Sequence, residues 1–468
     1  MSKGFITRWL LIALALHLAA AYFSTGYQNS DEHFQVLEFL NAYLGRTPWA
    51  ALPIEYVRSV RPWFQPFLYW IPVRALMALG ISSPFVWAGA IRLVSALIGW
   101  ASVVSLVSCI PIWIKKVRWQ RIAVITLALT WYIPAFHARH SSENLSGALF
   151  IIGLCWGARW LANSSSRLSP LLAVGLLWGF AFEARYQVGF MVAGGFFWLA
   201  LVKRARLSQL AAIVTGILAA TAFCTYLDFL GYGHWTFAPW NYFHFNLIEG
   251  YASVTDTSPW WDFFRRIWTE TWPVLGFICL AGMLVFWALN PWHPLTWTHL
   301  PFFLVHVVLA HKETRFLFPL AHAAPLCLVI AIQQLKLRPN LFLRLFTGSV
   351  IAMNGVALAA FTFLPAAPTL RFYSKVYDLV EAGTLHELRF SEWDPYTIGG
   401  IPMYFYRPSG LVLKPLESPA LENSYFYASP SPLDLTMAPR CLTLTRSLPD
   451  WHLLSRLHNW TLYACEKN

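Results

Sequence analysis

The chain has 468 residues, of which 57% are hydrophobic, 17% aromatic and only 12% charged, and its mean hydropathy is +0.50. Soluble domains carry about 25% charged residues, so this composition excludes an ordinary soluble protein and indicates an integral membrane protein. The net charge of +12 does not indicate a nucleic-acid binder, because Lys and Arg lie at the ends of apolar runs and not on one polar face.

Apolar runs long enough to cross a bilayer recur along the chain. They lie at residues 5–23, 85–114, 120–136, 145–162, 168–182, 188–202, 208–231, 273–289, 296–310, 316–335 and 343–364. These runs predict about eleven transmembrane helices, the first of them a retained signal anchor. Residues 63–80 contain Pro66, Pro72 and Arg74, and we expect a helix that lies at the interface or dips into the bilayer.

The basic loops set the expected orientation. Lys3 and Arg8 hold the N-terminus inside, and eleven crossings then place the basic loops at 115–121, 203–206 and 336–344 in the cytoplasm. Five polar segments fall on the opposite face, at residues 28–35, 136–144, 182–187, 232–272 and 311–316, together with the tail from 365. Ionisable groups at membrane depth are usually functional. We expect these segments to meet in one cavity at the non-cytoplasmic face.

Two domains are expected. Residues 1–364 form an all-α, multi-pass membrane domain whose first outer loop, 24–62, carries the catalytic group. Residues 365–468 lose the long apolar runs and gain Pro, Gly and Tyr, which indicates a small extracytoplasmic domain of mixed α/β structure. Cys441 and Cys465 lie in this tail and are candidates for a disulfide, whereas the other five cysteines lie in apolar runs and are expected in the core.

Asp31 and Glu32 follow the first apolar run. Adjacent carboxylates point in different directions, so we expect one of them to act as a general base that removes a proton from an attacking hydroxyl. A structural alternative is an N-cap at Ser30 or Asp31 with an acidic first helical turn.

Two groups of cations are candidates for binding a phosphate. Arg58 and Arg61 are three residues apart and would share a face if the segment is helical, either for phosphate or for lipid headgroups. His311, Lys312 and Arg315 lie within five residues between two apolar runs. Cations on an outer loop oppose the positive-inside bias, which indicates an anionic partner.

Polar and aromatic side chains in the remaining outer segments suit a sugar. Glu183 and Arg185 are candidates for a pair, which is either purely structural or part of the site, and Tyr186 and Gln187 suit contact with a polyol. The loop at 232–272 offers Asn241, Asn246 and Trp260 for hydrogen bonding and stacking, or for an aromatic belt. The sequence contains no Walker loop, dinucleotide-binding turn, zinc-ligand spacing or serine elbow. A lipid-borne substrate is therefore expected.

The chain resembles the Alg9-like mannosyltransferases, the group that includes the third mannosyltransferase of GPI-anchor assembly. The similar stretches are "DEHFQ" (31–35), "VRSVRPWF" (57–64), "ARHSSEN" (138–144), the loop "WTFAPWNYFHFNLIEGYAS" (235–253) with "SPWWDFF" (258–264), and "HKETRF" (311–316). Val60 and Arg61 depart from the family pattern. The resemblance implies a GT-C type glycosyltransferase that takes mannose from a polyprenyl phosphate, with Asp31 as the base.

The expected site combines these observations. We expect Asp31 and Glu32 to be catalytic, and His311, Lys312, Arg315, Arg58 and Arg61 to bind the donor phosphate. Nine further residues are expected to contact substrate: His33, Gln35, Arg139, Glu143, Arg185, Gln187, Asn241, Asn246 and Trp260.

The expected reaction is transfer of mannose, with inversion, from a dolichyl-type polyprenyl phosphate to a lipid-linked glycan or glycolipid. Alternatives are transfer of another sugar, such as a pentose onto lipid A, or transport of a lipid or sugar. No cofactor is expected to be required, and a divalent cation near Asp31 and Glu32 is left open. The membrane is expected to be a bacterial inner membrane, or the endoplasmic reticulum in a eukaryote.

Overall fold

A computed structural model describes residues 1–163, 167–254, 257–338, 340–416, 424–430, 441–447 and 460–466. The chain divides into two compact units. The first, which we call the helical unit, comprises Met1–Phe23, Arg58–Tyr69 and Ile91–Phe363. The second, the mixed unit, comprises Ser24–Val57, Trp70–Ala90 and Leu364–Asn468. The predicted division after residue 364, between membrane and extracytoplasmic parts, stays a prediction.

The long helices of the helical unit lie in the predicted apolar runs, and several shorter ones lie in the polar segments between them. They are α1 (Lys3–Phe23), α6 (Pro84–Trp113), α7 (Val117–Leu129), α8 (Ile133–His137), α9 (Ser142–Ala162), α10 (Ser169–Ala184), α11 (Gly189–Phe197), α12 (Leu207–Tyr232), α13 (Ala238–Phe243), α14 (Tyr251–Val254), α15 (Asp262–Glu270), α16 (Pro273–Leu289), α17 (Pro294–Val308), α18 (Phe318–Ala321), α19 (Ala324–Leu335) and α20 (Leu341–Phe363). Short π-helical segments cover Trp198–Val202 and His244–Ile248, and 3₁₀ turns cover Tyr186–Val188 and Thr314–Leu317.

The helical unit is that of a multi-pass membrane protein. By length and hydropathy, five of the described helices can cross a membrane, namely α1, α6, α9, α12 and α20. The number rises to seven if two bent pairs each count as one span, Pro273–Leu289 with Pro294–Val308 at 120° and Thr314–Ala321 with Ala324–Leu335 at 67°. The run predicted at 120–136 is not continuous, because α7 ends at Leu129 and α8 begins at Ile133 with a proline in its first turn.

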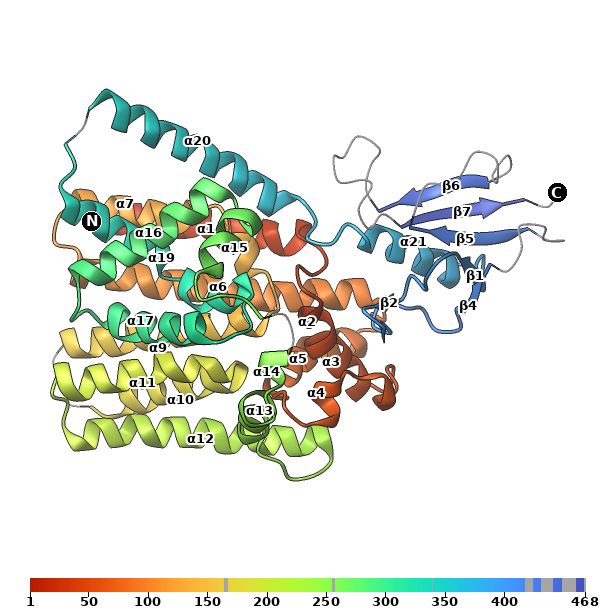
Figure 1. Ribbon diagram of the computed structural model, residues 1–468, viewed down its shortest axis with the longest axis horizontal. Helices are drawn as coiled ribbons and strands as arrows, with labels where there is room; N and C mark the ends of the chain where they lie inside the picture. The colour runs from red at the N-terminus through yellow and green to blue at the C-terminus, as the bar shows by residue number, and fades with distance from the viewer. Residues whose placement is uncertain are drawn as a thin grey trace. The chain divides into compact units, whose positions relative to one another are not determined.

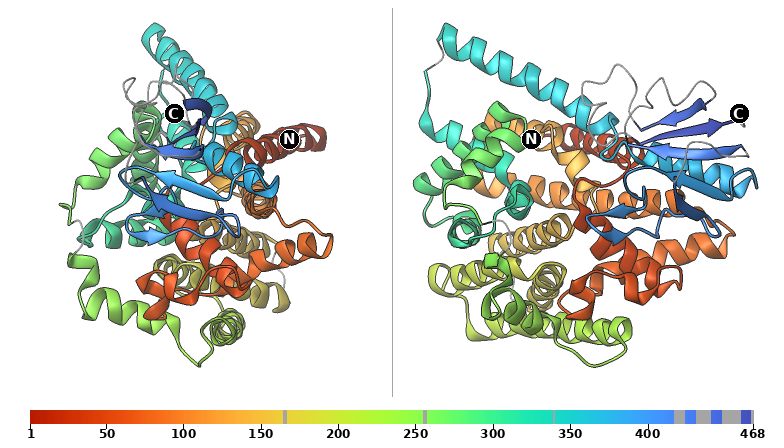
Figure 2. Two further views of the ribbon diagram at one scale, coloured as in Figure 1. Left: turned by 90° about the vertical axis from the view of Figure 1, so that its right-hand side faces the viewer. Right: turned by 45° about the vertical axis from the view of Figure 1, so that its right-hand side comes forward.

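Close approach of α10 and α12 depends on small residues. A Cβ on Gly175 would lie 2.1 Å from the Ile213 carbonyl oxygen, and one on Gly216 would lie 2.3 Å from that of Leu172. Helix pairs in membranes pack mainly through such close backbone contacts, because lipid offers no hydrophobic driving force for their association. Helices α9, α10 and α12 consequently run side by side (Figures 1 and 2).

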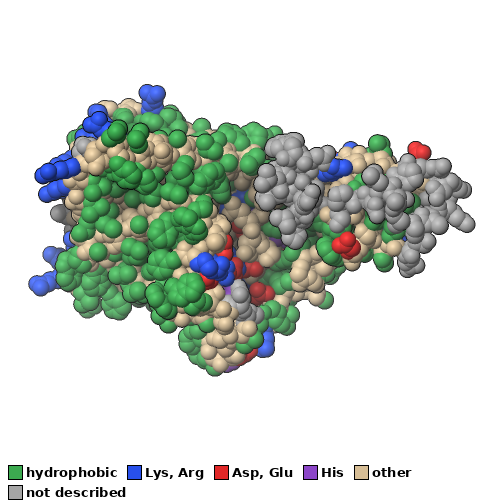
Figure 3. Space-filling model, turned by 45° about the horizontal axis from the view of Figure 1, so that its top comes forward, with side chains coloured by type: hydrophobic (Ala, Val, Ile, Leu, Met, Phe, Trp, Pro, Cys, Tyr) green, Lys and Arg blue, Asp and Glu red, His purple; other side chains and the backbone are tan. Residues whose placement is uncertain are grey.

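Positively charged side chains are unevenly distributed over the surface of the helical unit. Lys and Arg side chains gather at one end, and hydrophobic side chains cover the flank (Figure 3). This end carries the loops after α6 and after Trp198–Val202, with Lys115, Lys116, Lys203 and Arg204. The prediction that the basic loops lie in the cytoplasm stays a prediction.

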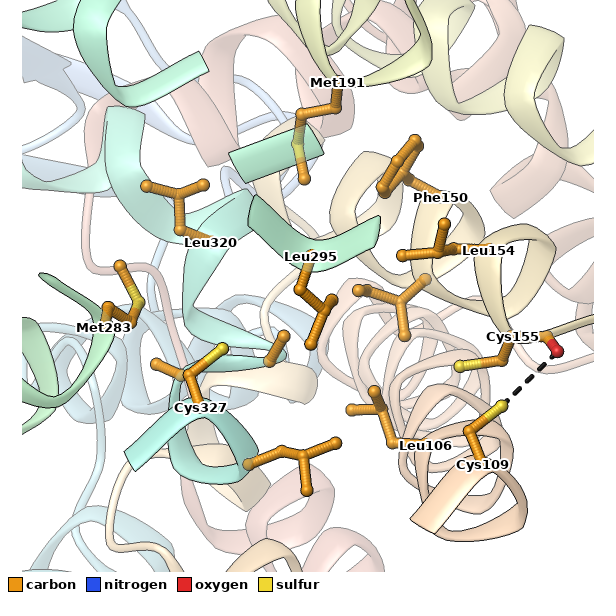
Figure 4. Packing of buried hydrophobic residues seen from close by; sticks show 14 of the residues in the cluster. Leu106, Cys109, Phe150, Leu154, Cys155, Met191, Met283, Leu295, Leu320 and Cys327 are labelled. Carbon is orange, nitrogen blue, oxygen red and sulfur yellow. Dashed lines mark hydrogen bonds between the residues drawn. The ribbon is translucent and has the colours of Figure 1, made fainter. Parts of the chain in front are cut away.

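The interior of the helical unit is apolar and closely packed. Leu106 and Cys109 of α6 face Leu154 and Cys155 of α9, and Leu295, Leu320 and Cys327 extend the same cluster (Figure 4). The Cys109 thiol donates to the Cys155 carbonyl at 3.4 Å. The five cysteines outside the tail are unpaired, and four of them are buried, as expected of small core residues.

The mixed unit joins short helices to a sheet. Its helices are α2 (Ser30–Glu32), a π-helical turn (His33–Leu37), α3 (Glu38–Tyr43), a 3₁₀ turn (Trp49–Ala51), α4 (Ile54–Val57), most of α5 (Phe64–Ala78) and α21 (Leu370–Glu381). Its strands are β1 (Glu387–Phe390), β2 (Thr397–Ile398), β3 (Ile401–Pro402), β4 (Val412–Pro415), β5 (Tyr425–Ser429), β6 (Cys441–Arg446) and β7 (Thr461–Cys465). The helix expected at 63–80 is thus present as α5.

The main sheet has the order β4-β1-β5-β7-β6. Strand β1 pairs in parallel with β4 and β5, whereas β7 pairs antiparallel with β5 and β6. Cys441 and Cys465 are directly opposite on β6 and β7 and form the predicted disulfide. The mixed α/β structure expected for the tail is confirmed.

Candidate functional site

The loop at 311–316 is organised around one carboxylate. Glu313 accepts hydrogen bonds from Arg315 Nε at 2.7 Å and Arg315 Nη2 at 2.8 Å, and its Oε1 lies 3.0 Å from His311 Nε2. Burial by itself would raise the pKa of Glu313, but these hydrogen bonds and charges hold the pKa below its usual value. The carboxylate therefore stays ionised and fixes the positions of His311 and Arg315.

Lys312 has different surroundings from its neighbours. Its ammonium donates to the Ser258 carbonyl at 3.0 Å and to the Leu309 carbonyl, and the residue is 1% exposed. Burial lowers the pKa of this ammonium. The Ser258 N–H also donates to the Ala310 carbonyl at 2.8 Å. Lys312 therefore ties the segment before α15 to the loop before Thr314.

A buried ion pair connects two other predicted segments. Glu143 lies in the first turn of α9, where Ser141 caps the helix by accepting from the Asn144 N–H at 3.2 Å. Glu143 Oε1 lies 2.9 Å from Arg185 Nη1 and 3.7 Å from Arg315 Nη1. Acidic residues are stabilised in a first helical turn by the helix dipole.

Opposite charges thus alternate through three distant parts of the sequence. We call this set the Glu143 network; its members are Glu143, Arg185, His311, Glu313 and Arg315. The network brings together four residues that the sequence predicted for the site, and it adds Glu313 as the carboxylate between two of them. The chain itself thus supplies anionic partners for His311 and Arg315, namely the carboxylates of Glu313 and Glu143.

The second group of predicted cations is arranged around Tyr242. The Arg61 guanidinium lies 5.7 Å from the Tyr242 ring centroid, and Gln187 donates to the Tyr242 hydroxyl. Arg58 pairs with Glu249 at 3.4 Å, where the Arg58 side chain is 51% exposed. Tyr242 was not predicted as a site residue; its position within the aromatic loop was the only signal.

Arg58 and Arg61 do not share a helix face. Helix α4 ends at Val57, and Ser59 has a φ of 49°, so the chain turns between the two arginines. The segment is instead held against α12, because the Tyr232 hydroxyl donates to the Arg61 carbonyl at 2.6 Å and the Trp63 N–H donates to Asp228 Oδ1 at 2.8 Å. The helical spacing that the sequence suggested is therefore wrong here.

Two side-chain amides predicted for sugar binding donate their hydrogen bonds to groups of the chain itself. Asn241 Nδ2 donates to the Ser59 carbonyl at 3.2 Å and to Thr236 Oγ1 at 2.8 Å. Asn246 Nδ2 donates to the Tyr242 carbonyl at 2.9 Å. Trp260 is 63% exposed. The amides shape this loop, and the side chain among these three that is open to a ligand is that of Trp260.

Two carboxyl groups on α10 and α12 are buried. Asp228 was missed by the sequence analysis, and the expected pairing of Glu183 with Arg185 is wrong, because Arg185 pairs with Glu143. Asp228 is 0% exposed and Glu183 is 1% exposed. Gly231, one turn after Asp228, leaves room for the Trp63 ring, because a Cβ there would lie 2.1 Å from it. A single carboxylate within the apolar run "TYLDFLGY" was the available signal for Asp228.

In the mixed unit, the segment 29–38 is held by its own polar groups. Asn29 caps α2 by accepting from the Asp31 N–H at 2.9 Å, so the cap is Asn29 and not Ser30 or Asp31 as expected. Glu32 is 4% exposed, and Asp31 is half-buried. Gln35 donates to Glu55 Oε1 at 3.1 Å.

Glu38 is the central acceptor of this segment. It accepts from the Tyr404 N–H at 2.7 Å, the Phe405 N–H at 2.8 Å and the Thr47 hydroxyl at 2.6 Å, and it lies 2.8 Å from His33 Nε2. His33 and Glu38 are five residues apart, which the π-helical turn His33–Leu37 brings into register. Glu38 was not predicted as a site residue. Its hydrogen bonds hold in place the helical segment that carries Asp31.

The remaining predicted residues lie at the start of α9. Arg139 is 0% exposed, and its carbonyl and that of His137 accept from Asn144 Nδ2 at 2.7 and 3.1 Å. Asp31 belongs to the mixed unit and Arg139 and the Glu143 network to the helical unit, so the expected convergence of Asp31 with these cations stays a prediction. Within the described residues, no three His, Cys, Asp or Glu side chains are grouped as metal ligands.

Comparisons with known proteins place the chain among glycosyltransferases. A sequence model described as the Alg9-like mannosyltransferase family matches residues 8–377. A probable Dol-P-Man:Man(7)GlcNAc(2)-PP-Dol alpha-1,6-mannosyltransferase of Schizosaccharomyces pombe is 27% identical over 313 residues, which cover 60% of this chain and 56% of that protein. GPI mannosyltransferase 3 of Yarrowia lipolytica is 22% identical over 453 residues, 93% of this chain and 84% of that protein.

The chain spans between 56% and 59% of the length of the first three curated relatives it matches. Among solved structures, the crystal structure of ArnT from Cupriavidus metallidurans bound to undecaprenyl phosphate has a TM-score of 0.59 at 13% identity, and it covers 99% of this chain and 98% of that chain. At this identity the likeness shows a shared fold, and it supports the predicted GT-C type architecture.

Proposed function

The chain belongs to the Alg9-like mannosyltransferase family, and from this premise we propose that it transfers a mannosyl residue from a polyprenyl phosphate to a hydroxyl of a lipid-linked glycan or glycolipid. The observation that carries the proposal is the family match over residues 8–377, which contains each candidate site residue from Asp31 to Arg315. The name of the Schizosaccharomyces pombe relative supports a dolichyl-phosphate donor and a lipid-linked acceptor, and that of the Yarrowia lipolytica relative supports a GPI-type acceptor.

The proposed step is a direct displacement at the anomeric carbon. The acceptor hydroxyl attacks C1 of mannose, Asp31 takes the hydroxyl proton, the C1–O bond to the phosphate breaks, and polyprenyl phosphate leaves with the bonding electron pair. The configuration at C1 inverts. The donor carries its own leaving group, so the reaction balances without a nucleotide.

Cations stabilise the departing phosphate in this scheme. His311 and Arg315 are fixed by Glu313 at 2.7–3.0 Å, and Lys312 lies in the same loop. Preorganised donors of this kind act strongly because they need no rearrangement as charge develops, and losing one costs about 10²–10³ in rate. Arg58, with half of its side chain exposed, is proposed as a further contact to the donor.

We propose that all eleven apolar segments cross the membrane, so that the five polar segments share the non-cytoplasmic face. The short α10, the divided run of α7 and α8 and the bent pairs would then be broken or tilted spans. The membrane is proposed to be that of the endoplasmic reticulum or a bacterial inner membrane. A divalent cation at Asp31 and Glu32 stays a proposal.

The test uses purified protein reconstituted in liposomes, with polyprenyl-phosphate mannose and, in parallel, a polyprenyl-phosphate pentose as donor. Two acceptors are offered, a GPI-type glycolipid and a diphosphate-linked oligosaccharide, and movement of intact donor lipid between the leaflets is followed in the same liposomes. Released polyprenyl phosphate and the mass of the product are measured. Mannose should appear on one acceptor, and Asp31→Asn should remove this activity. Asp378→Asn, the same change at an exposed position of α21, is the matched control and should leave the rate unchanged.

Three results would overturn the proposal. Consumption of a pentose donor in preference to the mannose donor would assign another sugar. Movement of intact lipid across the bilayer without cleavage would assign a transporter. Full activity of Asp31→Asn would remove Asp31 as the base.

A further inference from the structure

The helical segment that follows α12 exposes large apolar side chains. Residues 238–248 are continuously helical, first as α13 and then as the π-helical turn His244–Ile248. Five large apolar side chains on and next to this helix are 45–57% exposed: Phe237, Trp240, Phe243, Leu247 and Ile248. The steps of three and four residues from Trp240 to Leu247 place these side chains on one face of the helix. We call the five residues the apolar stripe.

The opposite face of the same helix packs against the protein. Phe245 is 6% exposed. Asn241 Nδ2 donates to the Ser59 carbonyl at 3.2 Å, and Gln187 donates to the Tyr242 hydroxyl. The helix thus has one face that is fixed to the protein and another, the apolar stripe, that faces outward.

The end of α12 that precedes this helix is remote from the basic loops. Lys203 and Arg204 come shortly before α12, which is one of the helices that can cross a membrane. Its 26 residues extend roughly 39 Å at 1.5 Å per residue. A hydrocarbon core is about 30 Å thick, and about 40–45 Å with the headgroup regions. A span that starts at these basic residues therefore brings Tyr232 to the depth of the opposite headgroups.

Helix α13 lies across this end of α12. In Figure 1, α12 runs across the view and α13 is seen nearly end-on, and the left view of Figure 2 shows the reverse. A helix that lies across a membrane-spanning helix runs along the membrane surface. This is the orientation of amphipathic helices that bind at the boundary between lipid and water.

Aromatic rings connect the apolar stripe to the exposed surface of α12. Trp235 stacks on Phe229 with 4.6 Å between ring centroids, and Phe229 stacks on Tyr226 at 6.4 Å. Tyr226 is exposed, as are Phe223 and Leu218 nearer the middle of the helix. A continuous apolar surface therefore runs from the part of α12 that lipid would cover to the segment after it.

The sequence places no charge on this surface after α12. Residues 233–248 contain no Asp, Glu, Lys or Arg. Large exposed apolar patches mark protein or membrane contacts, and aromatic side chains at the end of a span are typical of the headgroup region. Lipid is favoured over a protein partner here, because the patch continues the surface of a helix that can cross the membrane.

We propose that the apolar stripe inserts into the membrane leaflet at the Tyr232 end of α12, so that residues 238–248 form an interfacial helix. Its partner is the lipid surface, and its outward face lies among the acyl chains next to the headgroups. Its inward face holds the turn at Ser59 through Asn241. The membrane thereby keeps Arg58 and Arg61 at the depth of lipid phosphates. This anchoring goes beyond sugar transfer and does not rest on it.

Spin-label accessibility measures the depth of the stripe in the full chain reconstituted in liposomes. A nitroxide is attached at Leu247→Cys, and its collisions with oxygen, which concentrates in the acyl region, are compared with those with a water-soluble nickel chelate. Leu218→Cys on α12 and Asp378→Cys on α21, both exposed positions, are the references for lipid and water. The unchanged protein gives the background from native thiols. The label at Leu247 should lie about 5–10 Å below the headgroups.

Two pairs of substitutions test what drives the insertion, with the label moved to Phe243→Cys. Leu247→Asp with Ile248→Asp removes apolar surface at exposed positions and should shift the equilibrium from lipid toward water by at least about tenfold. Leu247→Met with Ile248→Val keeps the surface apolar. This second pair is the matched control and should leave the depth of the label unchanged.

Any of three results defeats the proposal. A label at Leu247 that meets the nickel chelate as often as the one at Asp378 places the stripe in water. Dipolar broadening between labels, lost on dilution with unlabelled protein, assigns the stripe to contact with a second copy of the chain. An unchanged depth of the Phe243 label in the Asp pair shows that the stripe does not anchor the segment.

Discussion

Glu143→Gln tests the Glu143 network directly. The substitution keeps the shape of the side chain and removes the charge between two arginines, at 2.9 Å from Arg185 Nη1 and 3.7 Å from Arg315 Nη1. At an effective dielectric constant of about 20, the closer pair attracts by about 6 kcal/mol, part of which offsets desolvation. Breaking a buried pair typically costs about 3–5 kcal/mol, because a charge is left buried without its partner.

Glu249→Gln is the matched control for this perturbation. Glu249 also pairs with an arginine, Arg58, at 3.4 Å, but its side chain is 35% exposed, against 2% for Glu143. An exposed pair contributes about 0–1 kcal/mol. Reversible unfolding in mixed detergent should therefore show a large loss of stability for Glu143→Gln and a small one for Glu249→Gln. Equal losses would refute the assignment of a buried, energetically coupled network.

Three further predictions follow from single residues. Asp31→Asn should lower kcat by about 10²–10⁴-fold with little change in unfolding, measured by release of polyprenyl phosphate; an unchanged kcat would contradict its role. The pKa of Glu313 is lowered from its usual 4.5, so its ion pairs stabilise the folded chain fully above pH 4.5, and this effect is lost progressively as the pH falls from 4.5 toward the lower pKa of the folded state. The stability difference between the native chain and Glu313→Gln should therefore shrink below pH 4.5, and a pH-independent difference would contradict this. Gly216→Ala places a Cβ 2.3 Å from the Leu172 carbonyl oxygen and should cost about 1–3 kcal/mol, whereas Gly348→Ala, with nothing within 4 Å, should not destabilise.

Helix positions were predictable from the sequence because hydropathy is a local property. The run predicted at 273–289 is α16, with the same bounds, and the run at 208–231 is α12 to within one residue at each end. The exception at 120–136 has a local cause that apolarity does not reveal, since the chain leaves α7 at Thr130 and α8 begins at Ile133, with Pro134 in its first turn. The sequence predicted the break between the runs at 273–289 and 296–310, where the chain bends by 120°, but it did not predict the 67° bend within the run at 316–335.

The sequence predicted which residue types form the site, but it did not predict which of these residues contact one another. His311, Arg315 and Glu143 were expected to bind substrate, and the structure shows that they also bind one another through Glu313. Asp228 was missed because an isolated carboxylate in an apolar run has no periodic signal. Its role, accepting the backbone N–H of Trp63, depends on a segment far away in the chain.

The amino-acid sequence by itself determined that this chain enters a membrane and which of its segments are apolar or basic, because the free energy of transfer into lipid depends on each segment's own composition. Only the tertiary structure decided that Glu143 pairs with Arg185 and that Glu38 holds His33 and the Tyr404 N–H. The reason is distance: a charge–charge or hydrogen-bonding contact acts over a few ångströms in space, and only the packing of the helices brings such groups that close.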